Sequence, residues 1–454
     1  MGTPTTNLRP KGTKHMLEYC PQNIEINLPC KPFSCKESRQ IGSEEHLFFE
    51  PTGDPEYCPD CGRPMTTNQW RNINLAGPPV LLAGKSIWHV KYKVLSCRDC
   101  GYYRSQEIPF RFMRTKCTTY LARMICEDLR SHNSTIKDVS RRYSIGWWLT
   151  RSVHMAFLRL MKDRCPPPQP PEVVAVDEFS VEKNHRYATL VIDARTKMPL
   201  FLHRGNSSED FAPFFHMCGK EFYSRIKAFA MDQNATYASV VRQYLPRCLI
   251  VCDYFHMIKN YNDEVVDVIR KRMVRDALIH RDSARTRRLK WSRRLVMKRI
   301  GEEDIEARLA LKDLMDESAE MDTAVHMRES LQLLYDNCRD ADVMKAEWEV
   351  WLRMAMVSGI PELMAFATKK ARKSEEVINH ARYAISSGVM EGCIAKIKVL
   401  KRVAYGFRNW DYFFMRIWHS FLPRGLCERL SEEVWESIEN GSIGGMNDDN
   451  RGTA

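Results

Sequence analysis

The sequence has no apolar run near the roughly 20 residues that a helix needs to cross a bilayer. Its first residues, MGTPTTNLRPKGTK, also lack the apolar region of a signal peptide. These absences predict a cytoplasmic protein with no membrane partner. No segment repeats at the period of a solenoid, which excludes a repeat architecture. Without an export signal, the 16 cysteines are expected to be thiols or metal ligands rather than disulfides.

The charge balance is only modestly basic. The formal net charge is +12 and the pI is near 8.9. This excess favours a polyanionic partner, although a basic protein without such a partner is the alternative. With 454 residues, 44% of them hydrophobic, the chain is too long for one ordinary core and predicts about two to four domains.

A proline-rich segment, residues 166–172, is the clearest boundary in the chain. Its five prolines cannot continue a helix and favour an extended spacer. A cysteine-bearing region and a region of helical spacing precede it, and strands follow it. Residues 1–45 show no sustained periodicity and predict an arm with little structure. The end of the chain, rich in Gly, Asn and Asp from Asn440 onward, predicts disorder.

Two CxxCG units stand before this boundary, Cys58 with Cys61 and Cys97 with Cys100. Each predicts a tight turn that places two thiolates about 2.3 Å from one metal ion, with a glycine relieving the backbone. With the strand pattern between them they predict a zinc ribbon, whose single Zn²⁺ is structural because four protein ligands leave no open position. Four unrelated thiols, or a redox pair, are the alternatives. Three further cysteines with irregular spacing are interpreted as ordinary thiols: Cys20, Cys30 and Cys35.

Residues 118–161 change to helical spacing. One apolar face is predicted to contain Leu121, Met124, Ile125 and Leu129. Two more helices are predicted about the turn at residues 144–146, the first capped by Thr135 and packed through Val139, the second buried through Trp147, Val153 and Phe157. This layout is typical of a helix-turn-helix, and a plain helical hairpin is the alternative. Three basic residues are available for DNA phosphates: Arg141, Arg142 and Arg151.

Downstream of the prolines, three strands at residues 173–176, 185–193 and 198–203 predict an antiparallel meander. The chain then alternates between helix and strand. The predicted segments are a helix at 208–222, a strand at 226–230, a helix at 237–244 and a strand at 248–251. This is the order of a ribonuclease-H-like mixed α/β sheet, in which the first and fourth strands are neighbours. The fold class is therefore predicted to be multidomain α+β.

Acidic residues follow the first and fourth strands of this order, Asp177 and Asp232. Two facing carboxylates repel each other and need a shared proton or a cation. Two Mg²⁺ or Mn²⁺ ions would neutralise them and clamp a phosphodiester. A single aspartate at a strand end is more often a cap or a turn residue. Side-chain alternation points the competing acid Glu178 away from Asp177, and Asp193 lies at the far end of a neighbouring strand.

Glu391 opens a helix whose polar face is basic, which fits an active-site carboxylate beside a DNA backbone. An ordinary first-turn glutamate, favoured by the helix dipole, is the alternative. The basic residues of this helix are Lys396, Lys398, Lys401 and Arg402. Residues 261–380 have helical periodicity and predict an α-helical insertion. Its first part is dense in Arg and Lys around Trp291, which favours either a phosphate-tracking surface or a solvated face.

Five segments occur in order behind the predicted zinc ribbon: VDEF, HRYATLVID, AMDQNATY, IVCDYFHMIKNYN and MEGCIAKIKVLKRVAYGFRN. From about residue 55 to residue 420, the chain therefore resembles the DDE insertion-sequence transposases of the bacterial ISL-three family. The resemblance implies that Asp177, Asp232 and Glu391 are the DDE triad. It also implies that Asp253 and His256 form a D-x-x-H element, in which the histidine positions the site. Many relatives carry an asparagine where this chain has residues 393–395, Cys-Ile-Ala.

The first hypothesis is accordingly a transposase that acts as a homodimer or higher oligomer on DNA. It would bind the terminal inverted repeats of its element, cut them by metal-dependent hydrolysis and join the 3′-hydroxyls to target DNA. The alternatives are a DNA-binding regulator with an inactive nuclease-like domain and a nuclease that cuts but never joins. The predicted division is an arm (1–45), zinc ribbon (46–112), helix-turn-helix (113–165), linker (166–172), catalytic domain (173–260 and 381–422), helical insertion (261–380) and tail (423–454).

Overall fold

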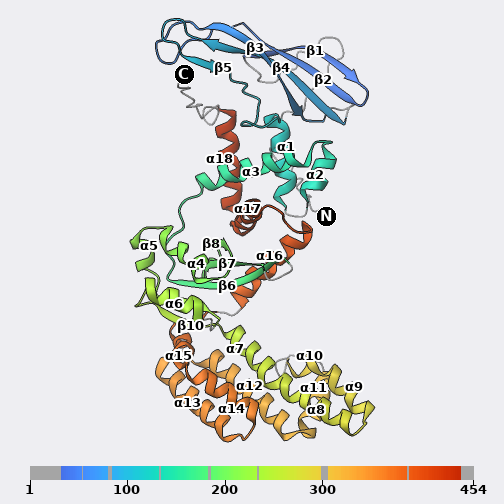
Figure 1. Ribbon diagram of the computed structural model, residues 1–454, viewed down its shortest axis with the longest axis vertical. Helices are drawn as coiled ribbons and strands as arrows, with labels where there is room; N and C mark the ends of the chain where they lie inside the picture. The colour runs from blue at the N-terminus through green and yellow to red at the C-terminus, as the bar shows by residue number, and fades with distance from the viewer. Residues whose placement is uncertain are drawn as a thin grey trace, which may run out of the picture. The chain divides into compact units, whose positions relative to one another are not determined.

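The computed structural model describes residues 32–53, 55–79, 84–131, 134–182, 186–232, 235–297, 305–385 and 388–440 (Figure 1). The first 31 residues of the predicted arm, with Cys20 and Cys30, and the end of the predicted tail from residue 441 lie outside the described residues. The chain forms two compact units. The first combines Met1–Cys165 with Leu400–Ala454, and the second is Pro166–Val399.

The first unit contains a mixed sheet in the order β1-β2-β4-β3, with β5 paired to β4. Its strands are β1 (Phe33–Ile41), β2 (Glu44–Pro51), β3 (Thr66–Gly77), β4 (Lys85–Ser96) and β5 (Tyr103–Ser105). Strand β2 runs parallel to β4, and the other pairs are antiparallel. The core of this sheet is aromatic and aliphatic: Phe33, Leu47, Phe49, Leu75, Trp88, Val90, Ile108 and Phe110.

Strand β1 corrects the expectation that residues up to 45 form an arm with little structure. It pairs with β2 in register from Phe33 opposite Pro51 to Ile41 opposite Glu44. Only Phe33 of this strand is buried. An edge strand held by backbone pairing needs no apolar alternation, so no hydrophobic periodicity in these residues indicated a strand.

Three helices follow the sheet in the first unit: α1 (Thr119–Arg130), α2 (Ile136–Arg142) and α3 (Trp147–Arg164). The predicted cap is confirmed, because Thr135 and Asp138 form a capping box at the start of α2. The predicted turn at residues 144–146 is also confirmed, with Ser144 at a φ of 51°. Val153 and Phe157 are buried as predicted, whereas Met124 and Trp147 are 37% and 40% exposed. The prediction that these two side chains are buried is therefore wrong.

The C-terminal helices α17 (Trp410–Phe421) and α18 (Arg424–Glu439) pack on α3. Tyr412 Oη lies 2.7 Å from His154 Nδ1, and Trp435 stacks on Phe157 with 5.0 Å between ring centroids. The described part of the expected tail is therefore almost entirely the helix α18, and residues from 400 onward belong with the N-terminal region. Its helical spacing was readable in the sequence, because Leu430 and Val434 recur one turn apart on the buried face.

The second unit contains the sheet β10-β9-β6-β7-β8. Its strands are β6 (Val173–Glu182), β7 (Arg186–Asp193), β8 (Pro199–Arg204), β9 (Ala228–Met231) and β10 (Leu249–Cys252). Strands β6, β9 and β10 are parallel, and β6, β7 and β8 form the antiparallel meander. The predicted neighbours, the first and fourth strands of the set, are confirmed as β6 and β9. Strand β6 continues to Glu182, past its predicted end at Val176, because β7 pairs along this length.

One face of this sheet is covered by short helices and α6 (Ala235–Tyr244). The single helix predicted at 208–222 is wrong, because the segment divides into α4 (Ser208–Phe211), η1 (Ala212–His216) and α5 (Lys220–Ser224). Pro213 follows α4 and Gly219 precedes α5, and both residues interrupt α-helices. Phenylalanines bury this layer against the sheet: Phe211, Phe214, Phe215 and Phe229.

The residues predicted as an α-helical insertion form a helical layer with its own core (Figure 1). Its elements are α7 (Tyr254–Tyr261), η2 (Asn262–Val266), α8 (Asp267–Ile279), α9 (Ser283–Trp291), α10 (Arg293–Val296), α11 (Ile305–Glu317), α12 (Ala319–Asn337), α13 (Ala341–Val357), α14 (Pro361–Ala371) and α15 (Ser374–Arg382). The last helix packs on β10, and α16 (Gly388–Val403) follows. Among the described residues, no helix is long and apolar enough to span a membrane.

Candidate functional site

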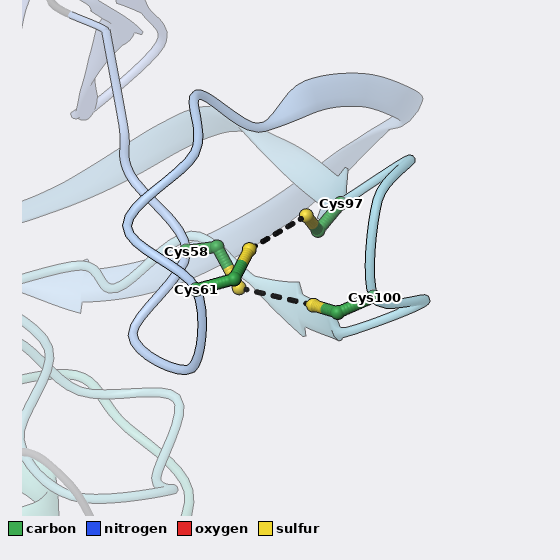
Figure 2. Close-up of side chains that lie close together, drawn as sticks. All are labelled: Cys58, Cys61, Cys97 and Cys100. Carbon is green, nitrogen blue, oxygen red and sulfur yellow. Dashed lines mark hydrogen bonds between the residues drawn. The ribbon is translucent and has the colours of Figure 1, made fainter.

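The four predicted cysteine ligands come together in the first unit. Cys58 and Cys61 precede β3, and Cys97 and Cys100 lie between β4 and β5 (Figure 2). The Sγ atoms of Cys58 and Cys100 are 3.5 Å apart, as are those of Cys61 and Cys97. All four Sγ atoms lie within 4.8 Å of one another. A tetrahedral zinc–thiolate site has sulfurs about 3.8 Å apart, so this cluster fits a zinc ribbon.

Local backbone hydrogen bonds build both halves of this cluster in the same way. The N–H of Gly62 donates to the carbonyl of Cys58 at 2.9 Å, and the N–H of Gly101 donates to that of Cys97 at 3.1 Å. Both glycines have positive φ, 69° and 75°, where a side chain would be strained. Each CxxCG unit therefore closes a tight turn with its two thiols directed to the same point.

Two of the four thiols, Cys97 and Cys100, differ in their affinity for protons. The backbone N–H of Cys100 lowers the pKa of Cys97 to about 7. For Cys100, the N–H of Tyr102 lowers the pKa, but the Cys58 thiol and burial together outweigh it. The pKa of Cys100 is therefore raised to about 12. Thiols this close cannot all ionise unless a cation balances their charge. The donor set therefore suits a thiophilic divalent ion.

The second group of predicted residues lies at one edge of the sheet in the second unit. Val176, Met231 and Cys252 are aligned across the parallel strands β6, β9 and β10. An aspartate follows each of them, so three carboxylates leave neighbouring strands at the same level: Asp177, Asp232 and Asp253. The N–H of Asp253 donates to the carbonyl of Met231 at 3.0 Å and continues the pairing to this point.

Helix α7 brings His256 to this edge. Asp253 caps the helix by accepting from the N–H of Phe255 at 2.8 Å. One turn later, His256 Nδ1 lies 3.5 Å from Asp253 Oδ2, and Nε2 lies 3.9 Å from Asp177 Oδ2. The imidazole therefore stands between two carboxylates.

Burial and mutual repulsion control the charges at this edge. Burial raises the pKa of Asp177 to about 6; His256 opposes this shift, and the charge of Asp253 adds to it. Burial alone would lower the pKa of His256, but Asp253, Asp177 and Asp232 raise it above its ordinary value. Three acids share one histidine, so the site has surplus negative charge. Oxygen donors with such a surplus fit a hard divalent cation.

The competing acids take other roles. Glu178 accepts a 3.4 Å hydrogen bond from Tyr237 of α6. Side chains two residues apart on a strand point to the same face of the sheet, so Glu178 shares a face with Val174 and Val176. Both valines belong to the core that α6 covers, and Glu178 therefore points away from Asp177, as predicted. Asp193 accepts hydrogen bonds from the N–H of Arg195 and the hydroxyl of Thr196, and so stabilises the turn between β7 and β8.

Glu391 lies in the first turn of α16 and is exposed. Within the described part of the chain, no hydrogen bond or ion pair connects it to Asp177 or Asp232. Among the described residues, its carboxylate does not form with those of Asp177 and Asp232 a group as close as the cysteine sulfurs. The residues at the departure from the family pattern, Cys393 and Ile394, are buried.

The predicted phosphate-binding residues differ in their surroundings. Arg142 pairs with Asp128 at 2.8 Å, and the Arg151 guanidinium lies over the rings of Trp147 and Trp148. Arg141 is exposed. On α16, three basic side chains are exposed and Lys401 is half-buried; the exposed ones are Lys396, Lys398 and Arg402.

The helical layer contributes buried polar groups that the sequence did not indicate as part of the site. Lys370 of α14 is 1% exposed. Burial lowers its pKa below the ordinary value, although Cys252 and Asp232 partly oppose this shift. On α15, burial lowers the pKa of His380 to about 4. Asn379 donates to the carbonyl of Ile250 in β10 at 3.0 Å. Lys370 was recognisable as a cation on the apolar face of α14, one turn after Phe366.

Comparison with known proteins supplies the class. The family model of the ISL-three (ISL3) DDE type, described as transposase, matches residues 174–417, more than half of the chain. The transposase for insertion sequence element IS1001 of Bordetella parapertussis is 28% identical over 375 residues, 83% of this chain and 91% of its own length. The transposase for insertion sequence element IS1557 of Mycobacterium tuberculosis is 28% identical over 257 residues, 52% of this chain and 57% of its own. The chain belongs to the ISL-three family of DDE transposases, which confirms the resemblance seen in the sequence.

Proposed function

We propose that this protein is the transposase of an insertion sequence, which binds the terminal inverted repeats, cleaves the DNA at each end and transfers the strands to target DNA. The observation that carries this proposal is the alignment of three aspartates on neighbouring parallel strands, with His256 between two of them. An acidic edge of this kind suits phosphodiester chemistry in a chain of this family. The sheet would serve as a ribonuclease-H-like catalytic core.

The proposed catalytic residues are Asp177, Asp232 and Glu391, which would hold two Mg²⁺ or Mn²⁺ ions. When bound, the ions supply an activated water and neutralise charge on the scissile phosphate. Asp177 would be ionised at neutral pH, because its pKa is about 6. His256 would position the carboxylates of Asp177 and Asp253 rather than accept a proton from water. Glu391 would complete the site from the first turn of α16.

DNA would be held by several basic surfaces. We assign repeat recognition to the first unit, with α2 and α3 acting as a helix-turn-helix beside a Zn²⁺-bound ribbon. The exposed basic residues of α16, which follow Glu391 on the same helix, would contact the backbone near the cleavage point. A homodimer or higher oligomer would hold both ends of the element.

A DNA-binding regulator with an inactive nuclease-like domain is the second candidate. It is favoured by the arrangement of the acids, because among the described residues Glu391 does not form with the aspartates a group of ligand atoms as close as the cysteine sulfurs. A nuclease that cuts without joining is the third.

One experiment separates the three. The protein is incubated with Mg²⁺ and DNA that carries the repeats flanking its own locus, and the product ends are mapped. Cleavage at the repeat ends with joined products supports the transposase. Cleavage without joining supports the nuclease, and repeat binding without metal-dependent cleavage supports the regulator.

A further inference from the structure

The tip of the helical layer, where α8 turns into α9, carries an open hollow of about 350 Å³. Figure 1 shows this tip at the end of the layer away from the β6–β10 sheet. Its lining combines apolar, hydroxyl and basic side chains: Leu278, Arg281, Thr286, Arg287, Lys290 and Trp291. The hollow is therefore separate from the carboxylate edge of the same unit.

An exposed indole dominates this hollow. Trp291 is 82% exposed and Leu278 is 53% exposed. Burying a large aromatic side chain is worth about 2–3 kcal/mol, so a tryptophan left in water at a concave site indicates a ligand with a flat apolar face.

The basic residues of α9 and of the turn before it fall into two sets. Arg285 and Arg288 are paired with Glu317, and Arg285 also pairs with Asp276 at 2.7 Å. In contrast, no ion pair with a described residue engages the three cations that line the hollow: Arg281, Arg287 and Lys290.

The single acid in the lining, Asp282, is already used as the cap of α9, because it accepts from the N–H of Arg285 at 2.9 Å. The hollow is therefore net positive and suits an anionic ligand.

Arg281 also has an unusual backbone. Its φ is 53°, in the left-handed region that glycine usually occupies after a helix. A side chain there costs on the order of 1 kcal/mol. A glycine at this position would avoid the backbone strain, whereas the arginine places a cation at the rim of the hollow.

We propose that this hollow binds an unpaired nucleotide of single-stranded DNA, with the base on Trp291 and its phosphates at Arg287 and Lys290. Aromatic stacking beside a basic groove is the recurring chemistry of single-strand binding. A base inside a duplex has both faces stacked and offers none to the indole. An acidic peptide would use the cations but leave Trp291 in water. The inference rests on the proposed function, because cleavage and transfer of strands create unpaired ends.

The test measures binding of a fluorescein-labelled oligothymidylate, and separately of a blunt duplex, to the full-length protein by anisotropy. Trp291→Ala should weaken oligothymidylate binding roughly 5- to 150-fold, since base stacking is worth about 1–3 kcal/mol, and change duplex binding far less. Trp291→Phe should restore most of the loss. Arg287→Ala with Lys290→Ala should reduce the salt dependence by about two phosphate contacts.

Lys345→Ala is the matched control, since it removes an exposed cation from α13 of the same unit. It should leave both affinities unchanged. Irradiation of a 5-bromodeoxyuridine oligonucleotide should crosslink it to the peptide that contains Trp291.

Equal losses for single strand and duplex in Trp291→Ala would overturn the proposal, as would unchanged binding or a changed oligomeric state. Asp232→Asn separates this inference from the proposed function. That variant should lose cleavage and retain oligothymidylate binding. A wild-type protein that binds the oligonucleotide through Trp291 but never cleaves repeat DNA would refute the proposed function and leave the single-strand site standing.

Discussion

The four cysteines and the three aspartates reach their positions by different routes. The cysteines come from two five-residue turns, each closed by its own backbone hydrogen bonds, and their sulfurs lie within 4.8 Å of one another. The aspartates come from three strands far apart in sequence, and His256 from the helix that follows. Among the described residues, the acidic edge contains no three ligand atoms gathered as closely as the cysteine sulfurs.

Under the proposed function, this difference would separate a structural metal site from a catalytic one. A closed set of four sulfurs fills the coordination shell of one ion and has nothing left for a substrate. Carboxylates held apart with surplus charge leave room for a phosphate and a water beside the ions. Burying a carboxylate in this way lowers the free energy of unfolding, as the raised pKa of Asp177 shows.

The strongest test of this contrast removes one carboxylate at a time. Asp177→Asn, Asp232→Asn and Glu391→Gln remove charge with little change of volume, so each should lower the rate of repeat cleavage roughly 10³-fold or more. Pairs of these changes should be strongly non-additive, because the three proposed catalytic residues would act as a unit. Repeat binding and folding should stay near wild type.

Glu178→Gln is the control for this series, since Glu178 adjoins Asp177 but faces Tyr237. Glu178→Gln should lower the rate of repeat cleavage far less than the three catalytic substitutions. A Glu178 variant as inactive as the Asp177 variant, or an active Asp232 variant, would show that the catalytic carboxylates are misassigned.

The cysteine site is tested by metal content. Elemental analysis should find about one zinc per chain, because four thiolates complete one tetrahedral site. Cys58→Ser or Cys97→Ser should abolish zinc retention and loosen the surrounding hairpins by several kcal/mol. Cys35→Ser, in strand β1 away from the four cysteines, should retain the full zinc content. Zinc retention by both ribbon variants would refute the site.

Truncation tests whether α3, like the cysteine turns, is stabilised by residues close to it in sequence. A fragment that ends at Cys165 should still bind zinc, because the CxxCG turns are closed within it. It should lack stable packing of α3, since Phe157 and His154 lose Trp435 and Tyr412, and removing one large aromatic contact costs about 3–5 kcal/mol.

Hydrogen exchange in α3 measures this loss, and fusing residues 400–440 to the fragment should reverse it. Repeat binding should follow the same pattern, because the proposed helix-turn-helix includes α3. Full protection of α3 in the short fragment would refute this dependence.

The smallest expected effect concerns Asp177 and pH. Its pKa in the folded protein is about 6, above the ordinary 3.8, so its ionisation opposes folding. Below about pH 4 the carboxyl is protonated in both the folded and the unfolded protein, so it does not lower the free energy of unfolding. Between about pH 4 and pH 6 the destabilisation grows, and above about pH 6 it stays constant at its full value. A pKa about two above the ordinary value corresponds to about 3 kcal/mol.

In EDTA, Asp177→Asn should therefore be more stable than wild type by up to about 3 kcal/mol above pH 6, and equally stable below pH 4. Urea denaturation at both pH values measures the difference, with Glu178→Gln as the control. A variant less stable than wild type at neutral pH would contradict the assigned burial penalty.

The sequence predicted the local features best. The CxxCG turns and the cap at Thr135 involve residues close in sequence, so the pattern itself specifies them. The neighbours β6 and β9 followed from the order of strands and helices. In contrast, Phe33–Ile41 is an edge strand with one buried residue, and β6 extends past Asp177 only because β7 pairs with it. Lys370 reached the site through helix packing, which no local pattern specifies.

The packing of α17 and α18 on α3 has a consequence for the order of events during synthesis. Helix α3 leaves the ribosome more than two hundred residues before Tyr412 and Trp435, which bury part of its apolar face. The first unit therefore cannot finish folding until nearly the whole chain has been translated. A nascent or prematurely terminated chain should not recognise DNA through this unit, so only full-length molecules would begin a transposition event.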